Sequence, residues 1–270
     1  MQFKKFLDID SSVSNHIILF KNNKIIYDSD LKTFQLDTKF LDIDYKNINF
    51  IGIGESDKKI YSAEIESDIK EVNIAYKSLI ELDIRNLLAV SSAEEILLMG
   101  RANQLLHWIK SNKYSGYSGE LNNFDSKEEV LFCPSTSSMI YPSISPCVLA
   151  MIIKGDEILL ARNAMFPKGL YSVLAGFIEV SESAEETVKR EVLEEVNLEI
   201  TNIKYFGSQP WPFPSQLMLG YICDYKSGEI QIDEKEIIEA NWYRYDNLPL
   251  VPPTSSLSGQ LINYFVEDRS

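Results

Sequence analysis

Three glutamates, Glu191, Glu194 and Glu195, stand at spacing i, i+3 and i+4 within the segment GFIEVSESAEETVKREVLEEVNL, residues 176–198. Residues three and four apart share one face of an α-helix, where three like charges repel one another. A hard divalent cation such as Mg²⁺ or Mn²⁺ removes that repulsion, because carboxylate oxygens are its preferred ligands. Beside a diphosphate, such a cation neutralises phosphate oxygens and activates water at neutral pH. The spacing therefore predicts metal-assisted hydrolysis, and the alternative is a solvated, glutamate-rich helix face.

The same segment carries the signals of an amphipathic helix over about residues 183–196. Ser183 and Glu186 have the spacing of a capping box, which satisfies free backbone N–H groups at a helix start. An apolar residue recurs every four positions, as expected for a buried helical stripe. These residues are Val188, Val192 and Val196. The helix is therefore expected to present its carboxylates on a face beside the buried stripe.

The segment also fits a longer pattern, G-x5-E-x7-R-E-U-x-E-E-x-G-U, in which U is a bulky aliphatic residue. The matching residues are Gly176, Glu182, Arg190, Glu191, Val192, Glu194, Glu195 and Leu198. The second glycine of the pattern is replaced by Asn197, which also tolerates the left-handed conformation that ends a helix. The segment therefore resembles the Nudix box, and a match of this length outweighs the solvated-face interpretation.

The resemblance implies a role for each of several residues. The implied metal ligands are Glu191, Glu194, Glu195, Glu236 and the backbone carbonyl of Ala175. They are expected to bind about two or three Mg²⁺ or Mn²⁺ ions. Glu195 is the candidate for activating the attacking water. We expect Arg190 to pair with Glu182 across the loop before the helix and to belong to the catalytic group.

A second motif, SQPWPFPSQLM at residues 208–218, indicates a stiff aromatic loop. Its prolines fix φ at alternate positions and hold Trp211 and Phe213 with little entropy left to lose. Such walls suit flat rings, although a proline-rich packing corner is the alternative. The motif resembles the SQPWPFP loop of the NADH pyrophosphatase branch of Nudix hydrolases, with Ser215 and Gln216 in swapped order. The implied substrate contacts are Gln209, Pro210, Trp211, Pro212, Phe213, Pro214, Ser215 and Gln216.

Four further positions match substrate contacts of that family. Tyr141 and Phe177 match the aromatic residues that sandwich the nicotinamide ring, and the resemblance implies that Tyr141 comes from the partner subunit of a homodimer. Ser258 falls at a contact position in the closing loop. Arg85 is a weaker match to a substrate-contacting arginine of the N-terminal domain.

The zinc ribbon common in this family is degenerate here. Its four cysteine positions are occupied by Ser115, Ser118, Cys133 and Thr136. One thiolate cannot make a tetrahedral structural zinc site, so we expect no bound zinc. Cys133 is then a remnant, and Cys147, in an apolar run, is expected in the core. His107 is expected to be a packed helix residue, because no nucleophile motif accompanies it.

The apolar pattern favours an α+β protein built from three parts. Residues 1–110 are expected to form a β-rich N-terminal domain that ends in a helix, and residues 111–140 a ribbon-like module or a linker. The family resemblance implies that residues 141–270 form a Nudix α/β/α sandwich with a mixed sheet. In the first part, hairpins are expected at 16–20 with 24–27 and at 48–53 with 59–65, and a helix at 92–110. In the last, strands are expected at 147–153, 157–162, 171–175, 204–206, 217–224 and 230–232, with helices at 183–196 and 257–265.

Composition limits the partners of the 270-residue chain. Forty acidic against 26 basic residues give a net charge of −14, which disfavours an extended nucleic-acid groove. The apolar run at 147–153 is far shorter than the ~20 residues that span a bilayer, and no signal-peptide core is evident near the N-terminus. Three irregularly spaced cysteines suggest a reducing compartment. We therefore expect a cytoplasmic protein without a membrane partner.

These features together predict metal-dependent hydrolysis of the pyrophosphate bond of NADH or NAD⁺, giving nicotinamide mononucleotide and AMP. Removal of an NAD cap from RNA is the same cleavage on a larger substrate. Two alternatives remain open. One is a Nudix pyrophosphatase acting mainly on ADP-ribose or another dinucleotide, and the other is a catalytically silent nucleotide-sensing module.

Overall fold

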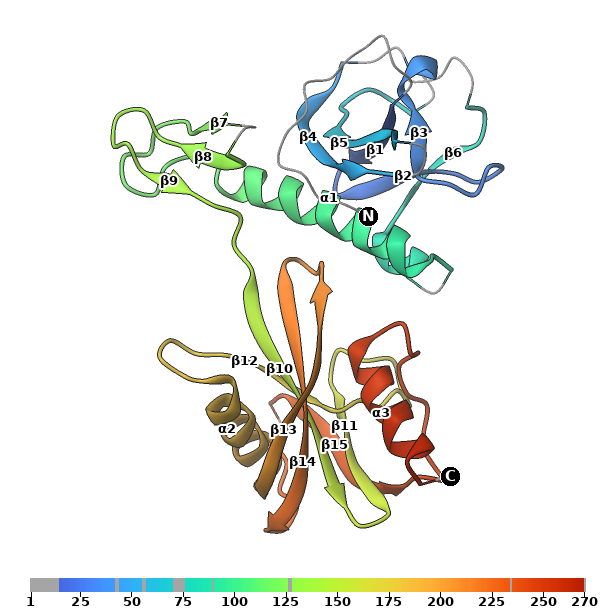
Figure 1. Ribbon diagram of the computed structural model, residues 1–270, viewed down its shortest axis with the longest axis vertical. Helices are drawn as coiled ribbons and strands as arrows, with labels where there is room; N and C mark the ends of the chain where they lie inside the picture. Colours follow the sequence, from blue (N-terminus) through green and yellow to red (C-terminus); the bar gives the residue numbers. More distant parts are fainter. Residues whose placement is uncertain are drawn as a thin grey trace. The chain divides into compact units, whose positions relative to one another are not determined.

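The computed structural model describes residues 15–41, 44–54, 57–69, 76–88, 90–125, 128–233 and 235–269 (Figure 1). Contacts divide the chain into two compact units, one of residues 1–143 with 212–214 and one of residues 144–211 with 215–270. Each unit has its own sheet and its own apolar core. None of the helices in the described ranges is both long and apolar enough to span a membrane.

A six-stranded sheet forms the body of the first unit, in the order β4-β5-β1-β2-β6 with β3 paired to β1. Its strands are β1 (His16–Lys21), β2 (Lys24–Asp28), β3 (Gln35–Asp37), β4 (Lys46–Ile53), β5 (Lys59–Glu64) and β6 (Leu79–Leu82). The predicted β1–β2 hairpin is confirmed, and Asn22 and Asn23 have the positive φ, 50° and 63°, that a type I′ turn needs. The pairing of β4 with β5 is also confirmed, although residues 55 and 56 between them lie outside the described residues.

The predicted helix of the first unit is α1 (Ala93–Ser111). Its capping box is confirmed, because the Ser92 hydroxyl accepts from the Glu95 backbone N–H and the Glu95 carboxylate accepts from that of Ser92. The helix buries its apolar side against the sheet. The buried residues of α1 are Leu98, Met99, Gly100, Ala102, Leu105, Leu106 and Trp108.

Residues 111–140 form a small module and not an extended linker. Three short strands make an antiparallel sheet: β7 (Asn123–Asp125), β8 (Val130–Phe132) and β9 (Met139–Ile140). The module has few apolar residues, but Leu131 belongs to the same core cluster as α1, and Phe124 makes an edge contact with Trp108. Its stability therefore comes from packing on the helix that precedes it.

Hydroxyl groups form the local contacts at Ser115, Ser118 and Cys133. The Ser115 hydroxyl accepts from the backbone N–H groups of Tyr117 and Ser118, which forms a local turn. The Cys133 sulfur lies 3.4 Å from the Ser118 hydroxyl and 3.5 Å from that of Ser135. Weak hydrogen bonds therefore connect Cys133 with this turn.

The second unit contains a mixed six-stranded sheet in the order β13-β14-β10-β11-β15, with β12 paired to β10. Its strands are β10 (Ser145–Lys154), β11 (Glu157–Asn163), β12 (Leu174–Phe177), β13 (Glu199–Trp211), β14 (Gln216–Ser227) and β15 (Ile237–Arg244). The pair β10–β14 is parallel and the other pairs are antiparallel. Pro210 can lie in β13 because this strand is at the sheet edge.

Two helices cover opposite faces of this sheet, α2 (Ala184–Val196) and α3 (Leu257–Glu267) (Figure 1). The valine stripe of α2 packs in one core cluster with Val148 and Leu174, whereas Leu261 and Phe265 of α3 pack in another with Met151. The predicted α/β/α sandwich with a mixed sheet is therefore confirmed.

One predicted strand in this unit was wrong, and one strand was missed. Residues 230–232 are not a strand, because the Gln231 backbone N–H bonds to the Val196 carbonyl at the end of α2, at 3.1 Å, and not to a sheet neighbour. β15 was missed, and its burial does not alternate as in a half-exposed strand. The predicted strand at 171–175 lies slightly later, at Leu174–Phe177.

Candidate active site

The glutamates of the 176–198 segment lie on α2, which begins and ends as the sequence predicts. Ser183 and Glu186 form a reciprocal capping box. Asn197 caps the other end in the left-handed conformation, with φ 59° and ψ 37°. Asparagine thus replaces the family's glycine without loss of the helix stop.

Arg190 connects α2 with the strand and loop before it. Its Nε and Nη2 donate to the two carboxylate oxygens of Glu182, at 2.6 and 2.9 Å, as predicted. Nη1 donates to Glu191 at 2.9 Å and to Glu194 at 3.0 Å. Nη2 also reaches the Phe177 carbonyl, at 2.9 Å. One guanidinium therefore orients three carboxylates and the end of β12.

The pKa of Glu182 reflects this contact. The pKa of Glu182 is lowered to about 2, chiefly by the Arg190 guanidinium and also by hydrogen bonds from the Thr187 hydroxyl and the Glu179 backbone N–H. Glu182 is therefore ionised at neutral pH, where it holds the Arg190 guanidinium.

Glu195 is the buried carboxylate of the group. Its residue is 5% exposed, and no hydrogen-bond partner for its Oε2 atom is found among the described residues. The pKa of Glu195 is raised to about 8, chiefly by burial and also by the charges of Glu191, Glu236, Glu194 and Asp233. Burial also raises the pKa of Glu191. A buried oxygen without a partner is costly unless a ligand completes it.

Gly176 makes room for Glu191. It lies on β12 opposite Val148, next to Ala175. A Cβ atom at Gly176 would lie 1.8 Å from Cδ and 2.3 Å from Cγ of the Glu191 side chain. The absence of a side chain at position 176 therefore decides where the Glu191 carboxylate can lie.

Glu236 is exposed on the turn before β15, in the second unit. The pKa of Glu195 responds to its charge, which places the two carboxylates within electrostatic reach. Within the described ranges, however, no three His, Cys, Asp or Glu side chains already converge as a metal-binding group. The predicted ligands are neighbours, and Arg190 holds two of them.

The side chain of Gln209, a predicted substrate contact, makes two hydrogen bonds within the second unit. Its side chain donates to the Ser255 carbonyl at 2.8 Å and accepts from the Leu257 backbone N–H at 2.7 Å. Ser258 is half-buried, and its hydroxyl lies 3.2 Å from that of Ser256, the N-cap of α3. Gln209 therefore fastens the closing loop to β13.

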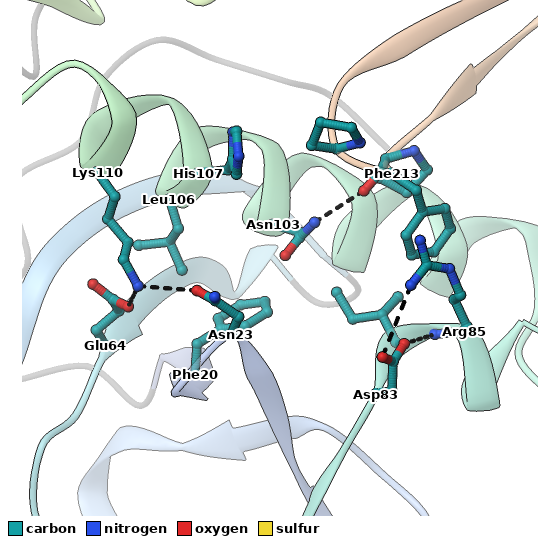
Figure 2. A pocket seen from close by; sticks show the side chains of 13 residues that line it. Phe20, Asn23, Glu64, Asp83, Arg85, Asn103, Leu106, His107, Lys110 and Phe213 are labelled. Atoms are coloured by element: carbon teal, nitrogen blue, oxygen red, sulfur yellow. Dashed lines mark hydrogen bonds and ion pairs between the residues drawn. The ribbon is translucent and has the colours of Figure 1, made fainter.

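Pro212–Pro214 pack with the first unit, where they line a cavity of about 330 Å³ (Figure 2). The Arg85 guanidinium lies over the Phe213 ring, 4.6 Å from its centroid. Asn103 donates to the Pro212 carbonyl at 2.9 Å. His107 also lines the cavity and is exposed, so its prediction as a packed helix residue was wrong.

Of the other predicted contacts, Trp211, Ser215 and Gln216 are partly buried, whereas Tyr141 and Phe177 are exposed. Tyr141 is 54% exposed and Phe177 is 52% exposed. Large aromatic side chains with half their surface in water are available for stacking on a ligand ring. Sequence reasoning missed Asn103, His107 and Lys110, which line the cavity from one side of α1. Their spacing of four and three residues along the helix was the available signal.

The family model for the NUDIX domain matches residues 144–265. Residues 144–265 form a Nudix domain. The NAD-capped RNA hydrolase NudC of Enterobacter sp. (strain 638) is 46% identical over 165 residues, 61% of this chain and 64% of that protein. NudC of Erwinia tasmaniensis is 46% identical over 165 residues, 61% of this chain and 63% of its own. The matches thus span less than two thirds of these relatives.

A crystal structure of a NUDIX hydrolase from Nitrosomonas europaea has a TM-score of 0.48 and 20% identity, and covers 58% of this chain and 92% of that one. The family-model match and the sequence identity to the curated relatives confirm the resemblance to the Nudix box at the level of the family.

The donor chemistry of the Nudix domain fits a divalent cation. The predicted side-chain ligands are carboxylates, which hard cations prefer. The Oε2 atom of Glu195 is buried and, among the described residues, lacks a hydrogen-bond partner, as expected for a metal-ligand position. The residues present therefore fit the divalent cation that the family resemblance implies.

Replacing Gly176 with alanine should displace Glu191. We expect a loss of about 1–3 kcal/mol in the free energy of unfolding from overpacking, and a fall in turnover of about 10²-fold from the misplaced carboxylate. Denaturant unfolding and steady-state kinetics measure the two effects. Gly207→Ala is the matched control, because a Cβ there makes ordinary contact with Leu257 at 3.9 Å. Equal activities of the two variants would contradict the prediction.

Proposed function

We propose that this chain hydrolyses the pyrophosphate bond of NADH or NAD⁺, giving nicotinamide mononucleotide and AMP. The observation that carries the proposal is the buried Glu195 carboxylate, with its open oxygen, beside the Arg190-bound carboxylates of the Nudix box. The identity to NAD-capped RNA hydrolases supports the choice of substrate. The aromatic loop supports it as well, because its rings suit a nicotinamide or adenine.

In this proposal Glu191, Glu194, Glu195, Glu236 and the Ala175 carbonyl hold Mg²⁺ or Mn²⁺. When bound, such ions neutralise diphosphate oxygens and lower the pKa of water. Arg190 fixes Glu191 and Glu194 through charge-assisted hydrogen bonds. Glu195 would accept the proton of the attacking water. Packing of α2 against the sheet keeps bulk water away from this carboxylate.

The proposed activity is tested by chromatography of the products formed from NADH, NAD⁺ and ADP-ribose with Mg²⁺ or Mn²⁺. We expect equimolar reduced nicotinamide mononucleotide and AMP from NADH. Cleavage of ADP-ribose alone would keep the hydrolytic chemistry and overturn the substrate. Failure to cleave all three would favour the silent nucleotide-sensing alternative.

Removal of an NAD cap from RNA is a second candidate, favoured by the names of the relatives. The bond that breaks is the same. The net charge of −14 opposes tight binding of a long RNA. A short NAD-capped oligonucleotide compared with NADH at equal concentration tests this candidate, and a 5′-monophosphate RNA product would support it.

We further propose that Arg85 contacts the substrate, as the family resemblance implies. The Arg85 side chain is 65% exposed and meets Asp83 at 4.0 Å, so its removal should cost little stability. Arg85→Ala should raise KM for NADH about 10-fold, the worth of one charge-assisted contact. Steady-state kinetics measures KM, with thermal unfolding as a check on the fold. An unchanged KM would exclude Arg85 from substrate binding.

We also propose that the ribbon module holds no zinc. Cys133 is buried between hydroxyl groups, which are poor zinc ligands. Inductively coupled plasma spectrometry of the purified protein should find far less than one zinc per chain. Dialysis against 1,10-phenanthroline should leave the unfolding midpoint unchanged. Stoichiometric zinc, or a chelator-induced drop of the midpoint, would refute this proposal.

A homodimer completes the proposed site, because the family resemblance assigns Tyr141 to the partner subunit. Light scattering after size-exclusion chromatography tests this point, and a monomer that is active on NADH would contradict it. The three cysteines are free and buried, which fits the proposed cytoplasmic location.

A further inference from the structure

After β14 the chain returns to the C-terminal end of α2, where its backbone N–H groups donate to the last carbonyls of this helix. Carbonyls in the final turn of a helix have no partner within the helix. Here the Gln231 backbone N–H donates to the Val196 carbonyl at 3.1 Å, and that of Asp233 donates to the Glu195 carbonyl at 3.0 Å. The segment is thus attached directly to the residue that carries the buried carboxylate.

Asp233 also builds the turn that carries Glu236. Its carbonyl accepts from the backbone N–H groups of Glu236, at 3.1 Å, and Ile237, at 3.0 Å. Its carboxylate oxygen Oδ1 accepts from the Lys235 backbone N–H at 3.0 Å. This is the local side-chain bond by which aspartate and asparagine stabilise turns. One residue therefore bonds to Glu195 on one side and to Glu236 on the other.

We propose that Asp233 is a positioning residue that holds the Glu236 turn in register with Glu195 for binding of a divalent cation. The proposal rests on the proposed function, in which both glutamates are metal ligands. The side-chain bond to Lys235 fixes the turn, and the backbone bond to Glu195 fixes its distance from α2. Outer residues that orient ligands commonly affect metal affinity about 10–100-fold when they are replaced.

Two substitutions of Asp233 distinguish its hydrogen bond to the turn from its negative charge. Asparagine keeps an oxygen that can accept from the Lys235 N–H and removes the negative charge, whereas alanine removes both. We expect Asp233→Ala to weaken Mn²⁺ binding about 10-fold and Asp233→Asn to keep it within about 2-fold. Isothermal titration of the full chain with Mn²⁺ alone measures the affinity. Asp246→Ala is a matched control, because Asp246 bonds to the Arg244 side chain on another turn.

Kinetics provides a second readout. The Mn²⁺ concentration that gives half-maximal NADH turnover should rise for Asp233→Ala, while kcat at saturating Mn²⁺ should approach the wild-type value. If Asp233→Ala merely destabilised the fold, it would lower kcat even at saturating Mn²⁺. It would also lower the unfolding midpoint measured in chelator. Asp233→Asn should behave as the wild type in both measurements.

Three outcomes would overturn the proposal. Equal weakening by asparagine and alanine would make Asp233 a charged ligand and not a positioning residue. Unchanged Mn²⁺ affinity in Asp233→Ala would show that the turn does not need this side chain. A wild-type chain that binds no Mn²⁺ would refute both this proposal and the proposed metal chemistry. Normal Mn²⁺ binding with the expected variant pattern but no NADH cleavage would refute the proposed function alone.

Discussion

A Glu195→Gln variant is expected to hydrolyse NADH about 10²–10⁴-fold more slowly than the wild type, the usual contribution of a positioned proton acceptor. Glutamine has nearly the same shape, so it fits the same buried position on α2. It has no carboxylate to accept a proton from water and is a weaker cation ligand. Initial rates with saturating Mn²⁺ measure the effect. Turnover within 10-fold of the wild type would remove Glu195 from the proposed role.

The same variant should be more stable than the wild type in metal-free buffer at neutral pH. Burial raises the pKa of Glu195 from 4.5 to about 8, so the folded chain binds this proton more tightly than the unfolded chain. The associated stability is complete below the unfolded pKa and is lost as the pH rises through about 8. Glutamine does not titrate and avoids this loss. Each kcal/mol gained corresponds to roughly 2–4 °C in the unfolding midpoint.

Thermal unfolding in chelator at pH 5, 7 and 9 tests this expectation. The difference between Glu195→Gln and the wild type should grow with pH and should shrink when Mn²⁺ is added, because the cation stabilises the ionised carboxylate. Glu194→Gln is the control, since its side chain is 59% exposed and water already solvates its charge. A variant that is less stable than the wild type at pH 9 would contradict the predicted sign.

The sequence predicted best what local spacing determines. The capping box of Ser183, the stop at Asn197 and the pairing of Arg190 with Glu182 all depend on residues a few positions apart. The depth at which Glu195 is buried depends instead on how α2 packs against the sheet, and spacing alone does not reveal it.

Contacts between distant segments could not be predicted from the sequence either. Asp233 and Glu195 are separated in the sequence by β13 and β14, yet they are bonded. The neighbouring bond from Gln231 to Val196 explains why residues 230–232, which alternate as a strand would, are not one. His107 was misjudged for a similar reason. Its helix is amphipathic, but the face it occupies borders a cavity closed by Pro212–Pro214, more than a hundred residues away.

An Arg190→Met variant is expected to lose about 2–4 kcal/mol in the free energy of unfolding and most of its activity. Methionine retains much of the packing volume but donates none of the five hydrogen bonds. The side chains of Glu182 and Glu191 are 20% and 12% exposed, so their charges would be left poorly solvated. Removing one partner of such a group costs more than the pair itself contributes. Urea unfolding measures the loss.

The double variant Arg190→Met/Glu182→Gln distinguishes two effects of the single variant: the unpaired Glu182 charge and the lost hydrogen bonds of Arg190. If the unpaired Glu182 carboxylate is the main cost, the double variant should recover part of the stability that Arg190→Met loses, because no buried charge remains at position 182. Activity should not recover, since Glu191 and Glu194 still lack the guanidinium that orients them. Full recovery of turnover would mean that Arg190 serves the fold alone. Recovery of stability without turnover would show that this arginine both neutralises the loop before α2 and aligns the carboxylates of the Nudix box.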